Sequence, residues 1–511
     1  KLRHNRTPAG KLRDDLWQAT TYQEWENKAR ELDVLLGNDV WKADPRSPYY
    51  DYKLIEHRLS LLREDRKKQD VMAVIYLLRC GLLRNLGGLN DVRLFQRSYL
   101  GTKNLIEEYT REVVSQLEYV ANSELMLQSI VEFFHDTKQS FGCSALVLYG
   151  GAAFGLYHLG VVKALNERGL LPRIISGTAI GALIAALVCI NTDEELPQIF
   201  QPNGIDLGAF SRVGQKGNVR RKITRLLKHG KYMMHVMAVL RYLMDVRVLQ
   251  ECVESNIGDL TFEEAFIKTK RILNITVNSA RKFEVPQLLN YLTAPNVLIR
   301  SAALASVAVT GLYDSVELLA KDKTGAIVPW APSHIQWKDS VPSESEYPFQ
   351  RITELFNVNH FILSQANPAV VPFMPKESSN KINGFILKCG HFISSEVQHR
   401  LYQLEHMHLL PKLFRSVVDE KLTANVTITP HISFSDFKQL VSNPTNNSLG
   451  YWIKKGEQST WPLLALIRNR TSIELALDRL TLNLKQTQSD RVTATLTEER
   501  KRRRTRTKSI Q

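Results

Sequence analysis

The chain has 511 residues, 44% of them hydrophobic, and a formal net charge of +15 at pH 7. This length and composition predict a substantial buried core, with room for two or three domains. The positive charge predicts attraction to polyanions, either nucleic acid or an anionic lipid surface. Nucleic acid is disfavoured because no nucleic-acid module is recognisable and aromatic residues are not interleaved with the basic runs. We therefore expect a lipid surface.

Five cysteines are scattered through apolar stretches without metal-ligand spacing, at Cys80, Cys143, Cys189, Cys252 and Cys389. This sparse, odd count fits a reducing compartment and argues against a disulfide scaffold, and we expect no metal and no cofactor. The chain starts at Lys1 with no visible signal peptide. Its longest apolar run, 179–190, is about half the ~20 residues of a membrane-spanning helix and predicts a buried helix instead.

The first 140 residues are predicted to form a helical N-terminal domain. Helical patterns cover 52–68, 71–83 and 105–119. Asn85-Leu86-Gly87-Gly88 follows the second pattern and has the chemistry of a helix stop.

The pattern changes at Cys143. An apolar strand at 145–149 leads into a glycine-rich turn at 150–155, and a helix follows at 156–168. A second strand at 171–175 ends in a tight turn at 176–181, and another helix runs to Ile190. This alternation of strands and helices predicts the α/β class, with a mostly parallel sheet covered on both faces.

Further strands are expected at 271–277 and 360–363, and a polar loop-like insertion at 320–348. We place the α/β domain at 141–370. A helical C-terminal extension is predicted over 371–490, including a helix at 397–418. A basic disordered tail is predicted over 491–511.

The glycine-rich turn could hold an anion. A strand that enters such a turn before a helix points backbone N–H groups at one spot, which suits a phosphate or a developing oxyanion. A phosphate-binding loop would end in Gly-Lys-Ser/Thr, whereas this turn runs on as Gly155-Leu156, and a dinucleotide site would want a third glycine where Ala152 stands. Simple helix–strand packing is the alternative.

The second turn reads Gly177-Thr178-Ala179-Ile180-Gly181. It lies where a strand gives way to a helix, the place of the nucleophile elbow Gly-x-Ser-x-Gly of hydrolases, but it lacks the hydroxyl. A glycine-flanked helix start is the alternative. Because the two turns are one βα unit apart, both should lie at the carboxyl ends of neighbouring strands, where open α/β sheets place their sites.

In this context the segments 149–165 and 174–187 resemble the core of the patatin-like phospholipases. The chain is most similar to the fungal lipid-droplet triacylglycerol lipases, a group that includes a yeast enzyme with an acyltransferase side activity. Segments 22–25 and 83–86 resemble the helical domain that precedes the catalytic domain in that group. Internal blocks of the same group are matched at 288–297, 354–359 and 452–462.

The resemblance implies a Ser–Asp dyad without histidine, and a glycine loop that binds the oxyanion. On this chain the oxyanion loop would be Gly150, Gly151 and Ala152, and the elbow glycines would be Gly177 and Gly181. The nucleophile position is Ala179, which cannot form an acyl-enzyme. The aspartate would be Asp339, although Ser340 rather than glycine follows it. A solvated loop aspartate is the alternative for Asp339.

Two further sequence patterns suggest a function outside the two turns. His431 and Asp436 have a His-x4-Asp spacing that supplies a base in some acyltransferases, although one match by chance is expected among 13 histidines. Seven basic residues within 216–231 precede a Met-rich apolar stretch at 232–240, which suits a surface resting on a phospholipid monolayer. A solvated helix beside a buried one is the alternative.

The expected function is that of a triacylglycerol lipase-family protein acting on neutral lipid, by ester hydrolysis in lipid droplet mobilisation, inactive as written because of Ala179. A deliberately replaced nucleophile would account for this. Two alternatives remain: a natural pseudo-lipase that binds lipid or stabilises an active lipase partner, and a lysophospholipid acyltransferase. The expected location is the lipid droplet surface, or the endoplasmic reticulum, as a peripheral membrane protein.

Overall fold

The structure is a computed structural model that describes residues 8–150, 152–208, 246–279, 287–307, 316–330, 337–338, 347–366, 424–432, 436 and 444–508. The chain divides into two compact units. The first, here called the helical unit, contains Lys1–Asp15, Glu26–Cys143 and Leu464–Gln511. The second, the sheet unit, contains Leu16–Trp25 and Ser144–Leu463.

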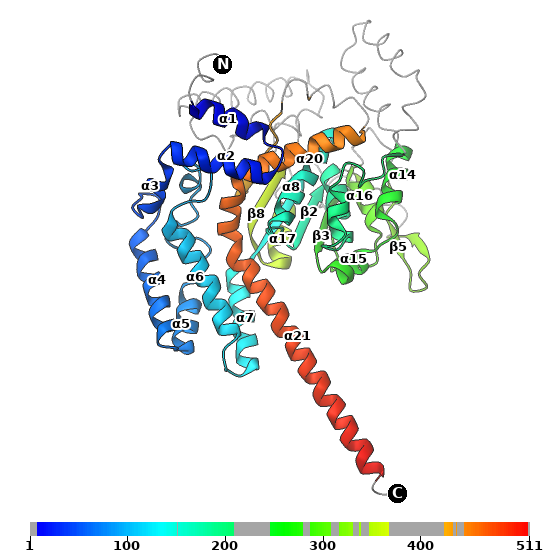
Figure 1. Cartoon of the computed structure of the whole chain (residues 1–511). Coiled ribbons are helices and arrows are strands. Elements are labelled where there is room, and N and C mark those ends of the chain that lie inside the picture. Colours follow the sequence, from blue (N-terminus) through cyan, green and yellow to red (C-terminus); the bar gives the residue numbers. More distant parts are fainter. Residues whose placement is uncertain are drawn as a thin grey trace. The chain divides into compact units, whose positions relative to one another are not determined.

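The helical unit is formed by α4 (Tyr52–Lys67), α5 (Val71–Gly81), α6 (Asn104–Ala121), α7 (Leu127–Phe141) and α21 (Leu464–Lys508), with the short α3 (Asn38–Ala43) (Figure 1). α1 (Pro8–Gln18) and α2 (Tyr22–Leu35) each cross from one unit into the other. Asp51 and Asp70 cap α4 and α5 by accepting backbone N–H groups with their side chains. The helices predicted at 52–68, 71–83 and 105–119 are thus confirmed.

The helix stop predicted at Asn85–Gly88 lies beyond the end of α5, which stops at Gly81 with Leu82 as its C-cap. Gly87 and Gly88 both have positive φ, in a short turn at Leu86–Gly88 that precedes a second one at Val92–Leu94. Only glycine adopts this conformation without strain. No single described helix is long and apolar enough to cross a membrane; α5 and Leu86–Leu94 meet that test only together, as a pair bent by 79°.

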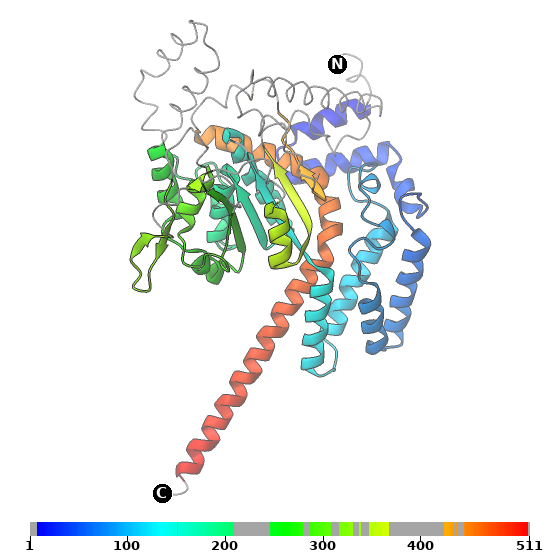
Figure 2. The ribbon, with the colours of Figure 1, turned by 180° about the vertical axis from the view of Figure 1, so that it is seen from behind.

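The sheet unit is built on a sheet with strand order β4-β3-β2-β1-β8-β9 among the described residues, and β7 also pairs with β3 (Figure 1, Figure 2). The strands are β1 (Cys143–Tyr149), β2 (Ile174–Thr178), β3 (Ile272–Ser279), β4 (Gln287–Leu289), β7 (Trp337–Lys338), β8 (Val358–Gln365) and β9 (Val426–Ile428). β1, β2 and β3 pair in parallel, as do β8 and β9, while β4 and β7 run antiparallel to β3. The predicted α/β class with a mostly parallel sheet is confirmed.

Helices connect the strands of the sheet, and α20 follows β9, the last described strand. They are α8 (Tyr157–Glu167), α9 (Ile180–Ile190), α10 (Leu196–Ile199), α14 (Val246–Ile257), α15 (Phe262–Thr269), α16 (Ile299–Val307), α17 (Tyr347–Phe356) and α20 (Asn446–Thr460), with short 3-10 turns at Ala152–Leu156 and Trp461–Leu463. Within the apolar run 179–190, α9 begins at Ile180, and its residues from Gly181 onward are all buried. It is therefore the buried helix expected from the sequence.

α8 and α20 cross at close range. A Cβ at Gly160 would clash with the Ile453 carbonyl, and one at Gly456 would clash with the Tyr157 carbonyl. The Lys163 ammonium pairs with the Glu457 carboxylate at 2.7 Å beside the crossing. Glycine on both helices allows the two backbones to touch, which fixes the start of α8 against the body of the unit.

Three segments differ from the sequence predictions. β2 covers 174–178 rather than 171–175, because Pro172 has no N–H for the strand ladder and Ser176 to Thr178 pair with β1 instead. The expected loop at 320–348 contains part of a hairpin, β5 (Leu319–Lys321) and β6 (Ile327–Pro329), closed by a turn in which Gly325 has φ 83°. The predicted disordered tail begins inside α21, which continues to Lys508 because no glycine or proline stands within it.

Candidate functional site

The two turns singled out in the sequence leave the sheet at the same edge. β1 and β2 are neighbouring parallel strands, and Tyr149, the last residue of β1, is in register with Thr178, the last residue of β2. The glycine turn follows Tyr149 directly, and Ala179 follows Thr178. Both bends therefore start side by side at the carboxyl ends of adjacent strands, the usual position of a site in an open α/β sheet.

The bend at Ala179 has the backbone of an elbow. Ala179 adopts φ 56° and ψ −130° and is partly exposed, and α9 begins at the next residue. A non-glycine residue in such a conformation costs on the order of 1–3 kcal/mol. The Ala179 carbonyl accepts the Ala182 N–H at 2.9 Å, and its own N–H donates to the Ser306 hydroxyl at 3.1 Å.

Steric contact explains both flanking glycines. A Cβ at Gly177 would lie 2.5 Å from the Ala182 Cα, so the strand and the helix touch across the elbow. A Cβ at Gly181 would clash with the carbonyl of Leu148 in β1. The pattern Gly-x-x-x-Gly is therefore required by the close approach of α9 to β1 and β2, whatever residue stands between the glycines.

The glycine turn packs directly on the elbow. Gly150 has φ 71°, the left-handed conformation that favours glycine. A Cβ at Gly155 would clash with the side chain of Ile180, the residue after Ala179. Phe154 fixes the far side of the turn by packing its ring on Trp452 of α20, with 4.8 Å between ring centroids. The turn and the elbow thus converge on one place.

Not every predicted site residue can be located. Gly150, Gly177, Ala179 and Gly181 are at the shared strand edge, and Ala152 is in the turn that starts α8. Gly151 and Asp339 lie outside the described residues, as do the basic and Met-rich segments at 216–240 and the helix predicted at 397–418. The assignment of the oxyanion loop and of the catalytic aspartate therefore remains a prediction.

A buried histidine lies beneath the turn and was missed by the sequence analysis. His158, in the first turn of α8, is fully buried, and its Nδ1 lies 2.8 Å from the Ser364 hydroxyl of β8. Burial lowers the pKa of His158 to about 4, while the carbonyls of Gly150 and Tyr149 oppose this shift. The ring is therefore neutral near pH 7. Nothing in the sequence links positions 158 and 364.

His431 and Asp436 have structural partners. The buried Asp436 carboxylate accepts a hydrogen bond from the Tyr451 hydroxyl at 2.7 Å and lies 3.7 Å from the Lys455 ammonium. Burial and this carboxylate raise the pKa of Tyr451. The His431 ring packs edge-on against Trp17 at 4.3 Å. These contacts anchor α20 and give no support to an acid–base pair.

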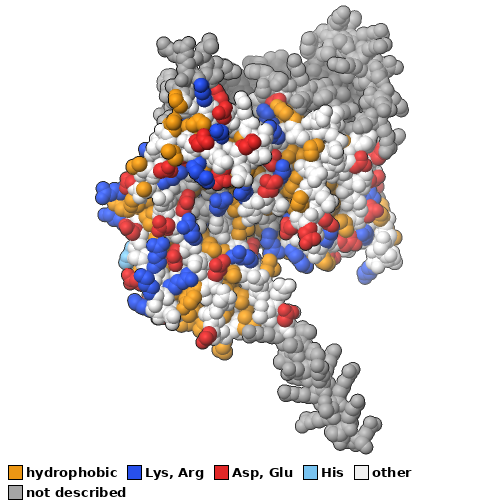
Figure 3. All heavy atoms as spheres, viewed as in Figure 1, with side chains coloured by type: hydrophobic (Ala, Val, Ile, Leu, Met, Phe, Trp, Pro, Cys, Tyr) orange, Lys and Arg blue, Asp and Glu red, His pale blue; other side chains and the backbone are white. Residues whose placement is uncertain are grey.

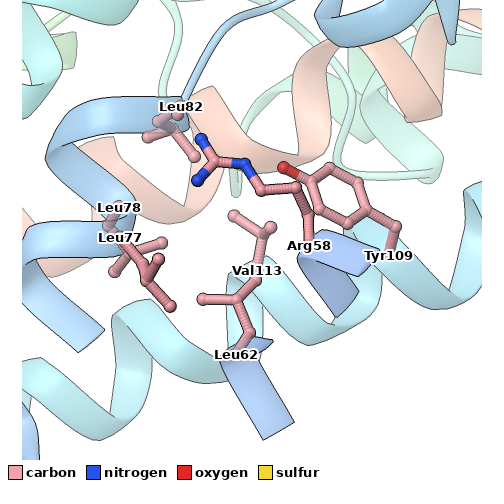
Figure 4. Close-up of a pocket in the computed structure, with 8 residues that line it drawn as sticks. Arg58, Leu62, Leu77, Leu78, Leu82, Tyr109 and Val113 are labelled. Atoms are coloured by element: carbon pink, nitrogen blue, oxygen red, sulfur yellow. The ribbon is translucent and has the colours of Figure 1, made fainter. Parts of the chain in front are cut away.

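Two cavities lie among described residues away from the strand edge. In the helical unit a slot between α4, α5 and α6 contains the Arg58 guanidinium beside Leu78 and Leu82 (Figure 4). Its volume is about 10 Å³, barely enough for one water molecule. In the sheet unit a polar hollow of about 530 Å³ is lined by residues 203–208, Asn256 and Asn446. Neither is lined by a residue of the turn or the elbow.

No group of three His, Cys, Asp or Glu side chains in the described ranges is arranged to hold a metal ion.

Comparison with known proteins decides the family. A domain of unknown function, DUF3336, matches residues 2–139, and the patatin-like phospholipase family matches residues 146–330. Triacylglycerol lipase ptl1 of Schizosaccharomyces pombe is 35% identical over 470 residues, which are 91% of this chain and 84% of that protein. The chain belongs to the patatin-like triacylglycerol lipase family.

Other similarities cover less. Triacylglycerol lipase 4 of Saccharomyces cerevisiae is 36% identical over 485 residues, but these are 52% of that protein, so the chain spans about half the length of this patatin-like relative. Among solved structures, the type III effector protein ExoU is similar at 14% sequence identity with a TM-score of 0.24. The match covers 69% of this chain and 62% of the ExoU chain. The patatin fold rests on the family match.

Proposed function

We propose that the strand edge of the sheet unit is a triacylglycerol ester site that lacks its nucleophile, so that this chain binds neutral lipid without hydrolysing it through residue 179. One observation carries the proposal. Ala179 keeps the strained elbow backbone, between two glycines that steric contact requires, although alanine has no group that can attack an ester. The triacylglycerol substrate is taken from the names of the relatives.

The proposed roles follow the family pattern. Gly150, Gly151 and Ala152 form the oxyanion loop, and Asp339 is the base that a serine at position 179 would need. The N–H of residue 179 is already donated to Ser306, so it is not free to bind an oxyanion as well. The amide of residue 179 is therefore not one of the proposed oxyanion donors.

Two origins of Ala179 fit this proposal. One is a deliberate replacement of serine in an active lipase. The other is a natural pseudo-lipase that binds lipid or stabilises an active partner. We further propose that the chain acts as a peripheral protein on an anionic phospholipid monolayer, at the lipid droplet surface or the endoplasmic reticulum. The net charge of +15 supports this location.

The decisive experiment restores the hydroxyl. We expect Ala179→Ser to release fatty acid from emulsified triolein and to react with a fluorophosphonate probe, while the parent chain does neither. Loss of the nucleophile in other serine hydrolases lowers kcat by roughly 10⁶, so the contrast should be large.

The control is the double variant Ala179→Ser with Asp339→Asn, which keeps the new serine but removes the proposed base. We expect it to lose both hydrolysis and probe labelling. A serine variant that stays inert in both assays, although it is folded like the parent, would show that the edge is no longer a lipase site. Activity that survives Asp339→Asn would exclude Asp339 as the base.

A further inference from the structure

The amide of residue 179 has an acceptor from another part of the sequence. The Ser306 hydroxyl accepts the Ala179 N–H at 3.1 Å. Ser306 is fully buried in α16, which packs against α9 and β3. Every residue of this helix except Arg300 is buried. The acceptor is therefore held by a helix that has little freedom to move.

This hydrogen bond acts on the strained residue of the elbow. At φ 56° and ψ −130° an alanine is disfavoured, so the surroundings must hold the backbone in place. The flanking contacts at Gly177 and Gly181 restrict the strand and the helix, but they do not fix the peptide plane between them. A buried acceptor for the N–H of residue 179 fixes that plane, because leaving this N–H unpaired would carry a desolvation cost.

We propose that Ser306 is a positioning residue that holds the elbow at residue 179 in its strained conformation. Its role in ester chemistry rests on the proposed function, since Ser306 acts through residue 179 and not on the lipid itself. With serine at position 179, the same hydrogen bond would aim the nucleophile at the ester carbonyl and keep the N–H of the elbow out of the oxyanion loop.

α16 offers a matched control. Ser301 lies on the same helix, is also buried, and its hydroxyl accepts the Leu319 N–H at 3.1 Å. The Ser306 hydroxyl thus accepts the amide N–H of Ala179, and the Ser301 hydroxyl accepts that of Leu319. Replacement of either by alanine removes one buried hydroxyl from the same helix, but only Ser306→Ala should affect the elbow.

The test is amide hydrogen exchange, resolved to single residues, in the chain as it stands. We expect Ser306→Ala to speed exchange at the Ala179 amide about five- to tenfold, the change that corresponds to one lost hydrogen bond. Ser301→Ala should leave Ala179 unchanged and speed exchange at Leu319. If the two variants affect Ala179 alike, or if neither does, the proposal is overturned.

A second variant separates positioning from general packing. Glycine tolerates positive φ, so Ala179→Gly removes the strain that Ser306 is proposed to hold. We expect the loss of stability caused by Ser306→Ala to be smaller in the Ala179→Gly background, whereas the loss caused by Ser301→Ala should be equal in both. Equal losses for Ser306→Ala in the two backgrounds would contradict the proposal.

The last measurement uses the restored nucleophile. In the Ala179→Ser background we expect Ser306→Ala to lower kcat about tenfold with little change in KM, since a hydrogen bond of average strength would then be lost from the aligned state. Ser301→Ala should change neither. An inactive Ala179→Ser chain would contradict the proposed function, and the exchange and stability results would still decide the role of Ser306.

Discussion

At the scale of single residues, the buried neutral imidazole of His158 links the site to solution pH. The ring is fully buried below the glycine turn and hydrogen-bonded to the Ser364 hydroxyl. A protonated ring would therefore carry its charge without contact to solvent. The folded pKa of about 4 is below the ordinary value near 6.5. As pH falls through 6.5 the unfolded chain takes up this proton first, so stability is lost on acidification and the loss ends near pH 4.

We therefore expect the native chain to lose about 2 kcal/mol more unfolding free energy between pH 7 and pH 5 than the variant His158→Asn. Urea unfolding at the two pH values measures this difference. His57→Asn, at an exposed histidine of α4, is the control and should behave like the native chain. Equal losses in the native chain and in His158→Asn would mean that His158 takes up its proton as readily in the folded chain as in the unfolded chain.

The residues around the elbow show what a sequence can reveal. Gly177 and Gly181 were recognisable because steric crowding at a strand-to-helix turn demands glycine at a fixed local spacing. Ser306 and Ser364 were not, because a serine hydroxyl that bonds a residue more than a hundred positions away leaves no local pattern. The turns were therefore predictable, and the groups that support them were not.

At the scale of elements, hydrophobic runs located the strands but not their ends. β2 was displaced by three residues because pairing with β1 draws Ser176, Gly177 and Thr178 into the ladder, which their side chains alone do not suggest. The charges at the end of the chain concealed the continuation of the C-terminal helix α21. Its basic end suggested a solvated tail, whereas the uninterrupted run of residues without glycine or proline favours a continuous helix.

α21 also belongs to the helical unit, although more than 300 residues separate it from the other helices of that unit in the sequence. Its Glu474 carboxylate pairs with the Arg84 guanidinium at 3.0 Å, and both side chains are nearly buried. Its Asn469 accepts a hydrogen bond from Thr110 of α6 at 2.8 Å and donates one to Asn90 at 2.9 Å. The helical unit, most of which lies before residue 144, thus depends for its contacts on residues beyond 463.

We expect a chain that ends at Leu463 to lose the fold of its helical unit. Removal of Glu474 alone would take away the carboxylate that pairs with the nearly buried Arg84 guanidinium. Breaking such an ion pair costs about 3–5 kcal/mol, a large part of the stability of a typical domain. Limited proteolysis should cut rapidly within α4 to α7. A chain that ends at Asp490 keeps these contacts and should resist cleavage like the full chain. Equal resistance of both truncations would show that α21 is dispensable.

At the scale of the whole molecule, the net charge of +15 is concentrated in two stretches. Residues 209–245 contain nine Lys and Arg against one Asp, and residues 491–511 contain eight against two Glu. The remainder of the chain is close to neutral. On the face shown in Figure 3, the described basic and acidic side chains are correspondingly intermingled. Attraction to an anionic surface should therefore depend mainly on the basic residues of these two stretches.

This concentration predicts how surface binding responds to salt. Raising the ionic strength from about 0.01 to about 0.15 M shortens the Debye length from roughly 30 to roughly 8 Å, so flotation with vesicles that contain phosphatidylserine should weaken strongly. The chain that ends at Asp490 should bind at least about tenfold more weakly at low salt, because each basic residue near such a surface contributes about 1 kcal/mol. Vesicles of phosphatidylcholine alone are the control. Binding that ignores both salt and lipid charge would contradict an electrostatic attachment and leave apolar contact as its cause.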